Sequence, residues 1–528
     1  MKAIRSAGTV LIPVMAALYP GLFLYAQNQS EILFSDTLRV LAASVVFALL
    51  CVLCFGVLFR RRDTAMLASV FSIVALFSYG HVYRFIKTWE IAGIDVGRHR
   101  YLAPLMGLLF LLGLFHIARN EKVRQRLVQW SSVAAIALFS FTLIQIGVSW
   151  DDGLQPQEEN ELENPGVGQP NSEAYPDIFY IILDGYARAD VMESVYGYDN
   201  SAFLEALEER GFFVAAESVS NYDLTLLSLP SSLNMTYLDD VVAAAGQEGT
   251  EREELTDLLR HSLVRETLTD RGYELVAFET GYPRTRIYDA DDYLEPVSDG
   301  TGMNSFENML LDTTLFRLFV DAFGSESERI ELALYPEYEM HRVRIRFILD
   351  SLGEIASRPE RSFVFAHIVS PHPPFIFDQN GNSVIYTRPF SMEDGDHYLG
   401  NSEDYWERYP DQVAYLNGLV LDAIDAILRE SESPPYILLQ ADHGPGAFLE
   451  WSAPEDEDIF SRFAILNAYY FPTQDYGELY SAISPVNSFR VLFNQLFDAG
   501  YTLDEDRSYF SPPQEILDFR DVTEIVTQ

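Results

Sequence analysis

Five long apolar stretches in the first 150 residues restrict, more than any other feature, what this chain can fold into. They cover about residues 8–27, 39–59, 66–86, 101–118 and 131–149. A run of about 20 apolar residues is the length that an α-helix needs to cross the hydrocarbon core of a bilayer. Because four similar stretches follow the first one, we interpret it as a membrane span and not as a cleaved signal peptide. The sequence therefore predicts a multi-pass transmembrane domain of five helices over residues 1–150.

The charges predict which way this domain crosses the membrane. Residues 1–150 contain 14 Lys and Arg against 6 Asp and Glu, whereas the rest of the chain contains 22 against 72. With five spans, three basic segments share one side of the membrane; they comprise Lys2, Arg5, Arg60, Arg61, Arg62, Arg119, Lys122, Arg124 and Arg126. The positive-inside tendency makes that side cytoplasmic. We expect a cell (inner or plasma) membrane protein with its N-terminus in the cytoplasm and its large C-terminal domain outside.

The composition of the large domain argues against nucleic-acid partners and against cysteine chemistry. Its strong negative charge repels nucleic acid, so we expect no DNA or RNA partner. The chain has two cysteines, Cys51 and Cys54, and both lie in the second apolar stretch. The exported domain therefore has neither disulfides nor a cysteine nucleophile.

An acidic linker and an α/β domain are predicted after the spans. Residues 151–175 are rich in Pro, Gly, Glu and Asn and lack apolar periodicity, as is typical of an extended linker. From residue 176 to 528, apolar runs alternate with amphipathic ones, which indicates a mostly parallel sheet with crossover helices. The strand-like runs are 177–183, 212–219, 273–278, 362–369, 436–440 and 462–471; the helix-like runs include 200–210, 252–270, 306–323, 327–355, 404–430 and 486–499.

Acidic residues follow two of these strands. Asp184 comes directly after the run 177–183, and Asp442 and His443 follow the run 436–440. Parallel strands bring such positions to one edge of a sheet, where ligands bind. Two carboxylates and an imidazole are suitable ligands for a divalent cation. For Asp184-Gly185 taken alone, a turn with a purely structural role is the alternative, whereas Asp442-His443-Gly444 is harder to explain by structure alone.

Together with two further motifs, this pattern resembles the alkaline phosphatase superfamily. The first motif is Thr225-Leu-Leu-Ser-Leu-Pro230, and the second is Ser370-Pro-His-Pro-Pro-Phe375. Within the superfamily, the chain is most similar to sulfatase-like membrane enzymes such as the lipoteichoic acid synthases and the phosphoethanolamine transferases. That resemblance implies an alkaline-phosphatase-like α/β/α domain outside the cytoplasm.

The resemblance also implies roles for individual residues. Asp184, Asp442, His443 and the Thr225 hydroxyl would bind one divalent ion (Mn, Mg or Zn), and Thr225 would be the nucleophile. His372 would contact the substrate and assist the leaving oxygen. Arg462 would bind an anionic substrate.

Each of these roles has an alternative that the sequence leaves open. Ser228, in a Ser-x-Pro-Ser segment that resembles the start of a sulfatase signature, is a second candidate nucleophile, although Ser232 stands where that signature has arginine. Thr225 could merely cap a helix, and His372 could be a turn residue. Arg462 could pair with a nearby acid, and His367, inside a strand, is interpreted as a core histidine.

The predicted function is transfer of a phospho-headgroup, of phosphoethanolamine or phosphoglycerol type, from a membrane phospholipid through a phospho-threonine. The partner is a membrane phospholipid or a cell-envelope glycan or lipid. Hydrolysis of phosphate or sulfate esters is the first alternative, and a non-catalytic binding or scaffold protein that retains the fold is the second.

Overall fold

The computed structural model describes most of the chain and divides it into two units. Described are residues 2–27, 34–87, 89–91, 94–95, 97–152, 175–238, 251–296, 305–318, 335–386, 388, 390–447 and 449–527. The first unit, the membrane unit, joins Met1–Glu159 and Gly300–Glu337, and the second, the α/β unit, joins Asn160–Asp299 and Tyr338–Gln528. Nearly all of the predicted linker at 151–175 lies outside the described residues.

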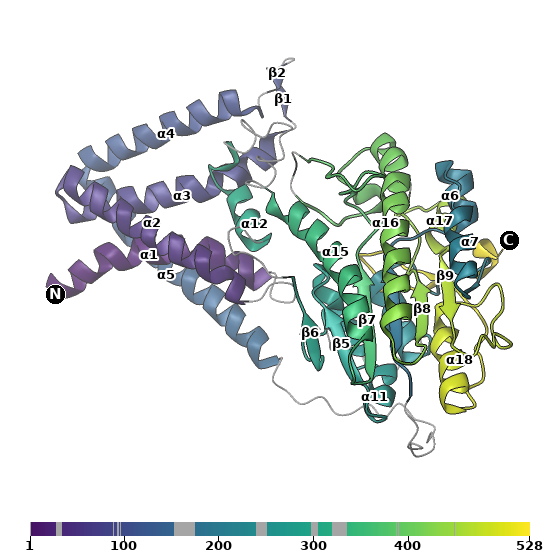
Figure 1. Cartoon of the computed structure of the whole chain (residues 1–528). Coiled ribbons are helices and arrows are strands. Elements are labelled where there is room, and N and C mark those ends of the chain that lie inside the picture. The colour runs from purple at the N-terminus through teal and green to yellow at the C-terminus, as the bar shows by residue number, and fades with distance from the viewer. Residues whose placement is uncertain are drawn as a thin grey trace. The chain divides into compact units, whose positions relative to one another are not determined.

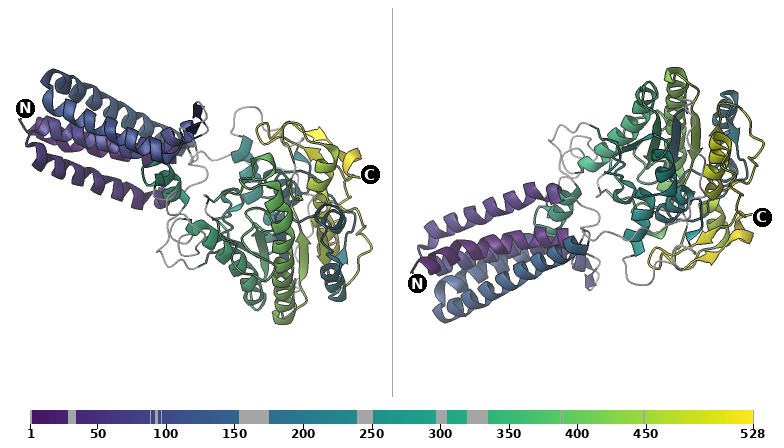
Figure 2. Two further views of the ribbon diagram at one scale, coloured as in Figure 1. Left: turned by 90° about the horizontal axis from the view of Figure 1, so that it is seen from above. Right: turned by 90° about the horizontal axis from the view of Figure 1, so that it is seen from below.

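The membrane unit contains the five predicted helices, each long and apolar enough to cross a membrane (Figure 2). They are α1 (Lys2–Gln27), α2 (Phe34–Phe59), α3 (Arg62–Ile86), α4 (His99–Arg119) and α5 (Glu121–Asp152). Each begins before its apolar stretch does, because polar and charged residues continue the helix beyond the apolar part. Two short strands, β1 (Glu90–Ile91) and β2 (Ile94–Asp95), form an antiparallel pair between α3 and α4.

A segment from the middle of the chain also packs in the membrane unit. Helix α12 (Ser305–Thr313) contacts α1, α2 and α3. Its Phe306 is buried in a cluster with Leu22, Tyr25 and Ile146. The sequence boundary near residue 150 gives no indication of this, because an amphipathic segment shows that it needs an apolar partner but not which one.

The α/β unit is built on a seven-stranded sheet of order β4-β9-β8-β3-β7-β5-β6 (Figure 1). The strands are β3 (Ile178–Leu183), β4 (Phe213–Val214), β5 (Glu274–Phe278), β6 (Asp292–Leu294), β7 (Ser362–Ile368), β8 (Tyr436–Gln440) and β9 (Asn467–Tyr470). All pairings from β8 to β6 are parallel, and β9 pairs antiparallel with both of its neighbours. The predicted α/β class and mostly parallel sheet are confirmed.

Helices cover both faces of this sheet. On one face, α8 (Thr225–Asn234), α11 (Leu263–Thr269) and α18 (Pro485–Phe497) share an apolar core with alternate residues of β3 such as Tyr180. On the other face, Phe347 of α15 (Pro336–Ala356) contacts Phe278 of β5. Helix α16 (Ser402–Glu430) lies close to α15, since a Cβ added at Gly353 would be 2.7 Å from the Ala426 side chain.

The remaining helices of the α/β unit are short. They are α6 (Ala189–Tyr196), α7 (Ser201–Glu209), α10 (Glu251–Arg260), α17 (Asp456–Phe463) and α19 (Thr523–Val526), and a second antiparallel pair is formed by β10 (Tyr509–Phe510) and β11 (Arg520–Asp521). The predicted single helix 252–270 is divided, because Ser262 caps a new helix by accepting a hydrogen bond from the N–H of Arg265.

Two predicted strands are wrong in extent. The run 212–219 forms only the two-residue strand β4, and the run 462–471 begins inside helix α17 and becomes a strand only at Asn467. Arg462 is therefore a helical residue. An apolar run shows that a segment is buried but does not distinguish a strand from the last turn of a helix.

Candidate active site and metal centre

Two strand ends place the predicted acidic residues at one edge of the sheet. Asp184 follows β3 and Asp442 follows β8, and these two strands are direct parallel neighbours. Gly185 has φ +74°, and a Cβ on it would be 3.4 Å from the Cα of His372. The turn after Asp184 thus needs glycine both for its backbone angle and for space. Asp184 in turn accepts the backbone N–H of His372 on its carbonyl, at 2.9 Å.

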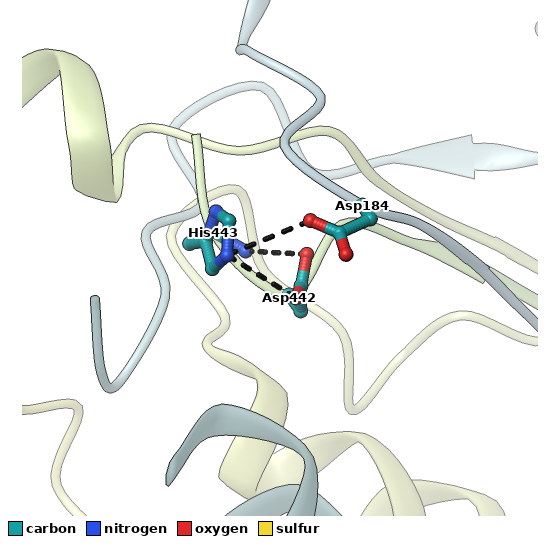
Figure 3. A group of neighbouring side chains, drawn as sticks. All are labelled: Asp184, Asp442 and His443. Carbon is teal, nitrogen blue, oxygen red and sulfur yellow. Dashed lines mark hydrogen bonds and ion pairs between the residues drawn. The ribbon is translucent and has the colours of Figure 1, made fainter. Parts of the chain in front are cut away.

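The structure brings Asp184, Asp442 and His443 together, with ligand atoms within 4.8 Å of one another (Figure 3). The Nε2 atom of His443 lies 3.6 Å from Oδ1 of Asp184 and 3.4 Å from Oδ2 of Asp442. All three side chains are buried. These two carboxylate oxygens have no hydrogen-bond partner among the described residues. Unpaired buried carboxylate oxygens are costly unless a cation binds them, so the group fits a divalent ion.

The tautomer of His443 suits it to metal binding. Its Nδ1 lies 3.0 Å from the carbonyl oxygen of Gly444, which can only accept, so Nδ1 carries the hydrogen. Its Nε2 lies 3.2 Å from Nη2 of Arg462, which can only donate, so Nε2 has a lone pair. A histidine ligand is normally oriented by a hydrogen bond of its other nitrogen, as it is here.

Charges around the site shift the pKa values of two of these residues. Burial lowers the pKa of His443, and Arg462 lowers it further, against the opposing effects of Asp442 and Asp184. The imidazole is therefore held neutral, as a ligand must be. Burial alone would raise the pKa of Asp184, but His372 and then His367 and His443 lower it below its ordinary value.

Thr225 lies beside this group at the start of a helix. It is the first residue of α8, and its hydroxyl is 3.1 Å from Nε2 of His443. The residue that precedes the helix is Leu224, so Thr225 does not cap it. The first N–H groups of a helix have no partner within it and can bind an anion. The hydroxyl thus lies between the candidate metal ligands and a place suited to a phosphate or sulfate group.

Ser228, the alternative nucleophile, lies one turn further along α8. Its hydroxyl donates to the carbonyl of Tyr222 at 2.9 Å, inside the protein. In the described part of the chain it is not among the residues that line the site pocket, whereas Thr225 is. Access to the pocket therefore favours Thr225.

One pocket is lined by all the predicted site residues except Asp442. Asp184, Thr225, His372, His443 and Arg462 all line it. The rest of its wall mixes apolar side chains such as Trp451 and Ile516 with charged ones such as Arg252 and Glu393. The rings of His372 and His443 are 6.1 Å apart between centroids.

Arg462 has a carboxylate partner, as one of the sequence interpretations proposed. It is 2% exposed, and its Nη1 lies 2.8 Å from Oδ2 of Asp394. Burial alone would raise the pKa of Asp394, but Arg462 and then His372 lower it. The sequence alone does not identify Asp394, because it lies in an irregular stretch among many acidic residues and no motif marks it.

His367 is buried as predicted, but it also contacts a candidate metal ligand. Its Nε2 is 3.2 Å from Oδ2 of Asp184, and its Nδ1 is 2.9 Å from the hydroxyl of Thr285. The contact uses Oδ2 of Asp184 and leaves Oδ1 on the side of His443, another candidate metal ligand. Strand pairing explains the position: Ile182 is the register partner of His367, which places the histidine near the end of the adjacent strand.

Comparison with known proteins finds likeness in structure alone. No family model and no curated protein matches the sequence. Three solved structures that resemble the chain are the periplasmic domain of EptC from Escherichia coli in complex with Zn, the integral membrane lipooligosaccharide phosphoethanolamine transferase A from Neisseria meningitidis, and BT1596, a 2-O GAG sulfatase.

The extent of these likenesses differs. For EptC the identity is 12% over 67% of this chain and 94% of that chain, with a TM-score of 0.42. For the transferase A it is 11% over 93% of this chain and 95% of that chain, with a TM-score of 0.40. For the sulfatase it is 12% over 63% and 72%, with a TM-score of 0.35.

Proposed function

We propose that the chain is a membrane-anchored, metal-dependent enzyme that transfers a phospho-headgroup, of phosphoethanolamine or phosphoglycerol type, from a membrane phospholipid through Thr225. One observation carries the proposal. A threonine hydroxyl, accessible from a pocket, lies 3.1 Å from the lone-pair nitrogen of a histidine that belongs to a buried group of candidate metal ligands. A threonine hydroxyl is a weak nucleophile, and such surroundings are what activates it.

Asp184, Asp442, His443 and Thr225 would hold one divalent ion, Mn, Mg or Zn. Such an ion stabilises the charge of the transferring group and lowers the pKa of a bound hydroxyl. The protein itself contributes orientation: the turn at Gly185 and the hydrogen bond from His443 to Gly444 hold two of the ligands. The helix N-terminus at Thr225 adds N–H groups that favour an anion.

The proposed reaction has two steps. In the first, Oγ1 of Thr225 forms a bond to phosphorus and the bond from phosphorus to the lipid alcohol breaks. The threonine proton passes to water in the pocket, and protonated His372 gives a proton to the departing oxygen. In the second step, an acceptor hydroxyl gives its proton to His372 and attacks phosphorus, the bond to Thr225 breaks, and the freed Thr225 oxygen takes a proton back from water. This role for His372 is supported by its position in the lining of the pocket, where its ring centroid is 6.1 Å from that of His443.

Arg462 is proposed to contact the transferred group through Nη2. Its Nε and Nη1 are already bonded to protein oxygens, and its Nη2, now 3.2 Å from Nε2 of His443, would be released when a metal ion takes that lone pair. The five apolar helices support a substrate that is itself in the membrane, and the loop charges support a cytoplasmic N-terminus with the α/β unit outside. A cell-envelope glycan or lipid is the proposed acceptor.

The test is mass spectrometry of the full-length protein after exposure to phospholipid vesicles and Mn²⁺. We expect a mass increment of one phospho-headgroup, mapped to the peptide that contains Thr225, which is absent in Thr225→Ala. Ser228→Ala is the matched control and should retain the increment. An increment that survives in Thr225→Ala but not in Ser228→Ala would reverse the assignment of the nucleophile.

The same experiment separates transfer from hydrolysis. With labelled phospholipid, a transferase releases diacylglycerol in quantity only when an acceptor alcohol is present, whereas a hydrolase releases it in water alone. A wild-type protein that neither acquires the increment nor releases diacylglycerol would contradict both activities on phospholipid.

A further inference from the structure

A buried ion pair in the wall of the pocket connects the segments that carry the reactive groups. Its members are Asp394, which precedes the short 3₁₀ helix Gly395–His397, and Arg462, in the last turn of α17. Their side chains are 4% and 2% exposed, and both line the pocket. Neither residue is one of the candidate metal ligands. We call this pair the Asp394–Arg462 brace.

Arg462 binds two segments at once. Its Nε donates to the carbonyl oxygen of Asp223 at 2.8 Å, two residues before Thr225. Its Nη1 donates to the carbonyl oxygen of Gly444 at 3.0 Å, directly after His443. The backbones that carry Thr225 and His443 are therefore tied to one rigid, planar guanidinium.

Asp394 holds that guanidinium in place. Its Oδ2 accepts from Nη1 of Arg462 at 2.8 Å, and its Oδ1 accepts from the hydroxyl of Tyr405 at 3.0 Å. The same Tyr405 hydroxyl accepts the N–H of Gly446 at 3.2 Å. Each carboxylate oxygen of Asp394 thus has a donor, which a buried charge requires.

The local sequence accommodates the brace closely. A Cβ on Gly446 would lie 2.7 Å from Oδ2 of Asp394 and 3.2 Å from Nη1 of Arg462, so a side chain there would displace the pair. The ring of Trp451 lies 5.3 Å from the guanidinium carbon, and its Nε1 donates to the Asp394 carbonyl at 3.3 Å. The pair is packed on all of these sides and has little freedom to move.

We infer that the Asp394–Arg462 brace is a positioning device that sets the Thr225 hydroxyl against Nε2 of His443. Asp394 touches neither Thr225 nor His443 and acts through Arg462. The inference rests on the proposed function for its effect on turnover, but its effect on metal affinity does not depend on which reaction the site performs.

The test uses the full-length protein in lipid nanodiscs and compares Asp394→Asn with Asp396→Asn. Asp396 is exposed, two residues away, and provides the matched control. We expect Asp394→Asn to lower Mn²⁺ affinity, measured by calorimetry, by about 10–100-fold, the usual effect of removing a group that orients a ligand. We expect kcat for labelled phospholipid to fall by a similar factor with KM within about twofold, and Asp396→Asn to change neither.

Two further variants keep the test decisive. Asp394→Asn combined with Arg462→Gln should lower kcat no more than the worse single change, because the two residues act as one unit. If Asp394→Asn fails to fold, Tyr405→Phe removes one donor to Asp394 and should shift Mn²⁺ affinity and kcat in the same direction by less.

The outcomes are distinguishable. Unchanged Mn²⁺ affinity and kcat in a folded Asp394→Asn protein would overturn the brace, as would a rise in KM alone, which would leave the pair with only the substrate contact proposed for Arg462. Wild-type protein that binds Mn²⁺ but shows no turnover would contradict the proposed function, while weaker Mn²⁺ binding by Asp394→Asn than by Asp396→Asn would still support the brace.

Discussion

The Asp442→Asn variant should be more stable than wild type when metal is absent and less stable than wild type when metal is present. The Oδ1 atom of Asp442 accepts the N–H groups of Gly185 and His443 at 3.2 and 3.0 Å, and an amide oxygen can accept both. Its Oδ2 has no partner in the described chain and lies 3.4 Å from the lone pair of His443 Nε2. An amide NH₂ at that place becomes a donor to the same nitrogen.

The expected magnitudes follow from these contacts. Removing an unpaired buried carboxylate oxygen relieves about 1–3 kcal/mol, so metal-free Asp442→Asn should unfold a few degrees above metal-free wild type. Metal at 1,000 times its Kd stabilises wild type by about 4.1 kcal/mol, which exceeds the whole of that relief. The amide is a poorer ligand, so the variant should gain much less, and the order of the two melting temperatures should reverse.

The measurement is thermal unfolding of the full-length protein in detergent, followed by tryptophan fluorescence with a chelator or with Mn²⁺. Asp396→Asn is the control for loss of one exposed negative charge and should follow wild type in both conditions. If Asp442→Asn were less stable than wild type with the chelator present, the carboxylate would be contributing to the metal-free fold, and the reasoning from its unpaired oxygen would be refuted.

Two further predictions concern neighbouring buried groups. His367→Gln should weaken Mn²⁺ binding by about 10–100-fold in calorimetry, because the contact of Nε2 that orients Asp184 is lost; unchanged affinity would return His367 to a purely structural role. Burial, opposed by Arg462, raises the pKa of Asp223 to about 7. Since this carboxyl binds its proton more tightly in the folded state, its contribution to stability is complete below pH about 4 and is lost as the pH rises through about 7. Melting curves of Asp223→Asn should therefore show a smaller decline between these pH values than wild type does, and an equal decline would contradict the shift.

Much of the fold could be predicted because its signals are local. Apolar stretches long enough to span a bilayer show themselves without any knowledge of their neighbours, and all five became helices. The runs at 177–183 and 436–440 became adjacent buried strands, since residues buried on both faces of a sheet form continuous apolar runs. The elements that differed, at 212–219 and 462–471, are those in which burial is strong but periodicity is weak.

The sequence by itself determined that two carboxylates and an imidazole follow strands. It also implied that Asp184 and Asp442 lie at one edge of the sheet, because alternating strands and helices form parallel sheets. Only the tertiary structure decided how the remaining groups act. The two members of the brace, Asp394 and Arg462, are 68 residues apart in the chain. His367 contacts Asp184, which lies 183 residues before it. Long-range pairing of charges depends on distances that no local pattern records, so the brace exists only in the folded protein.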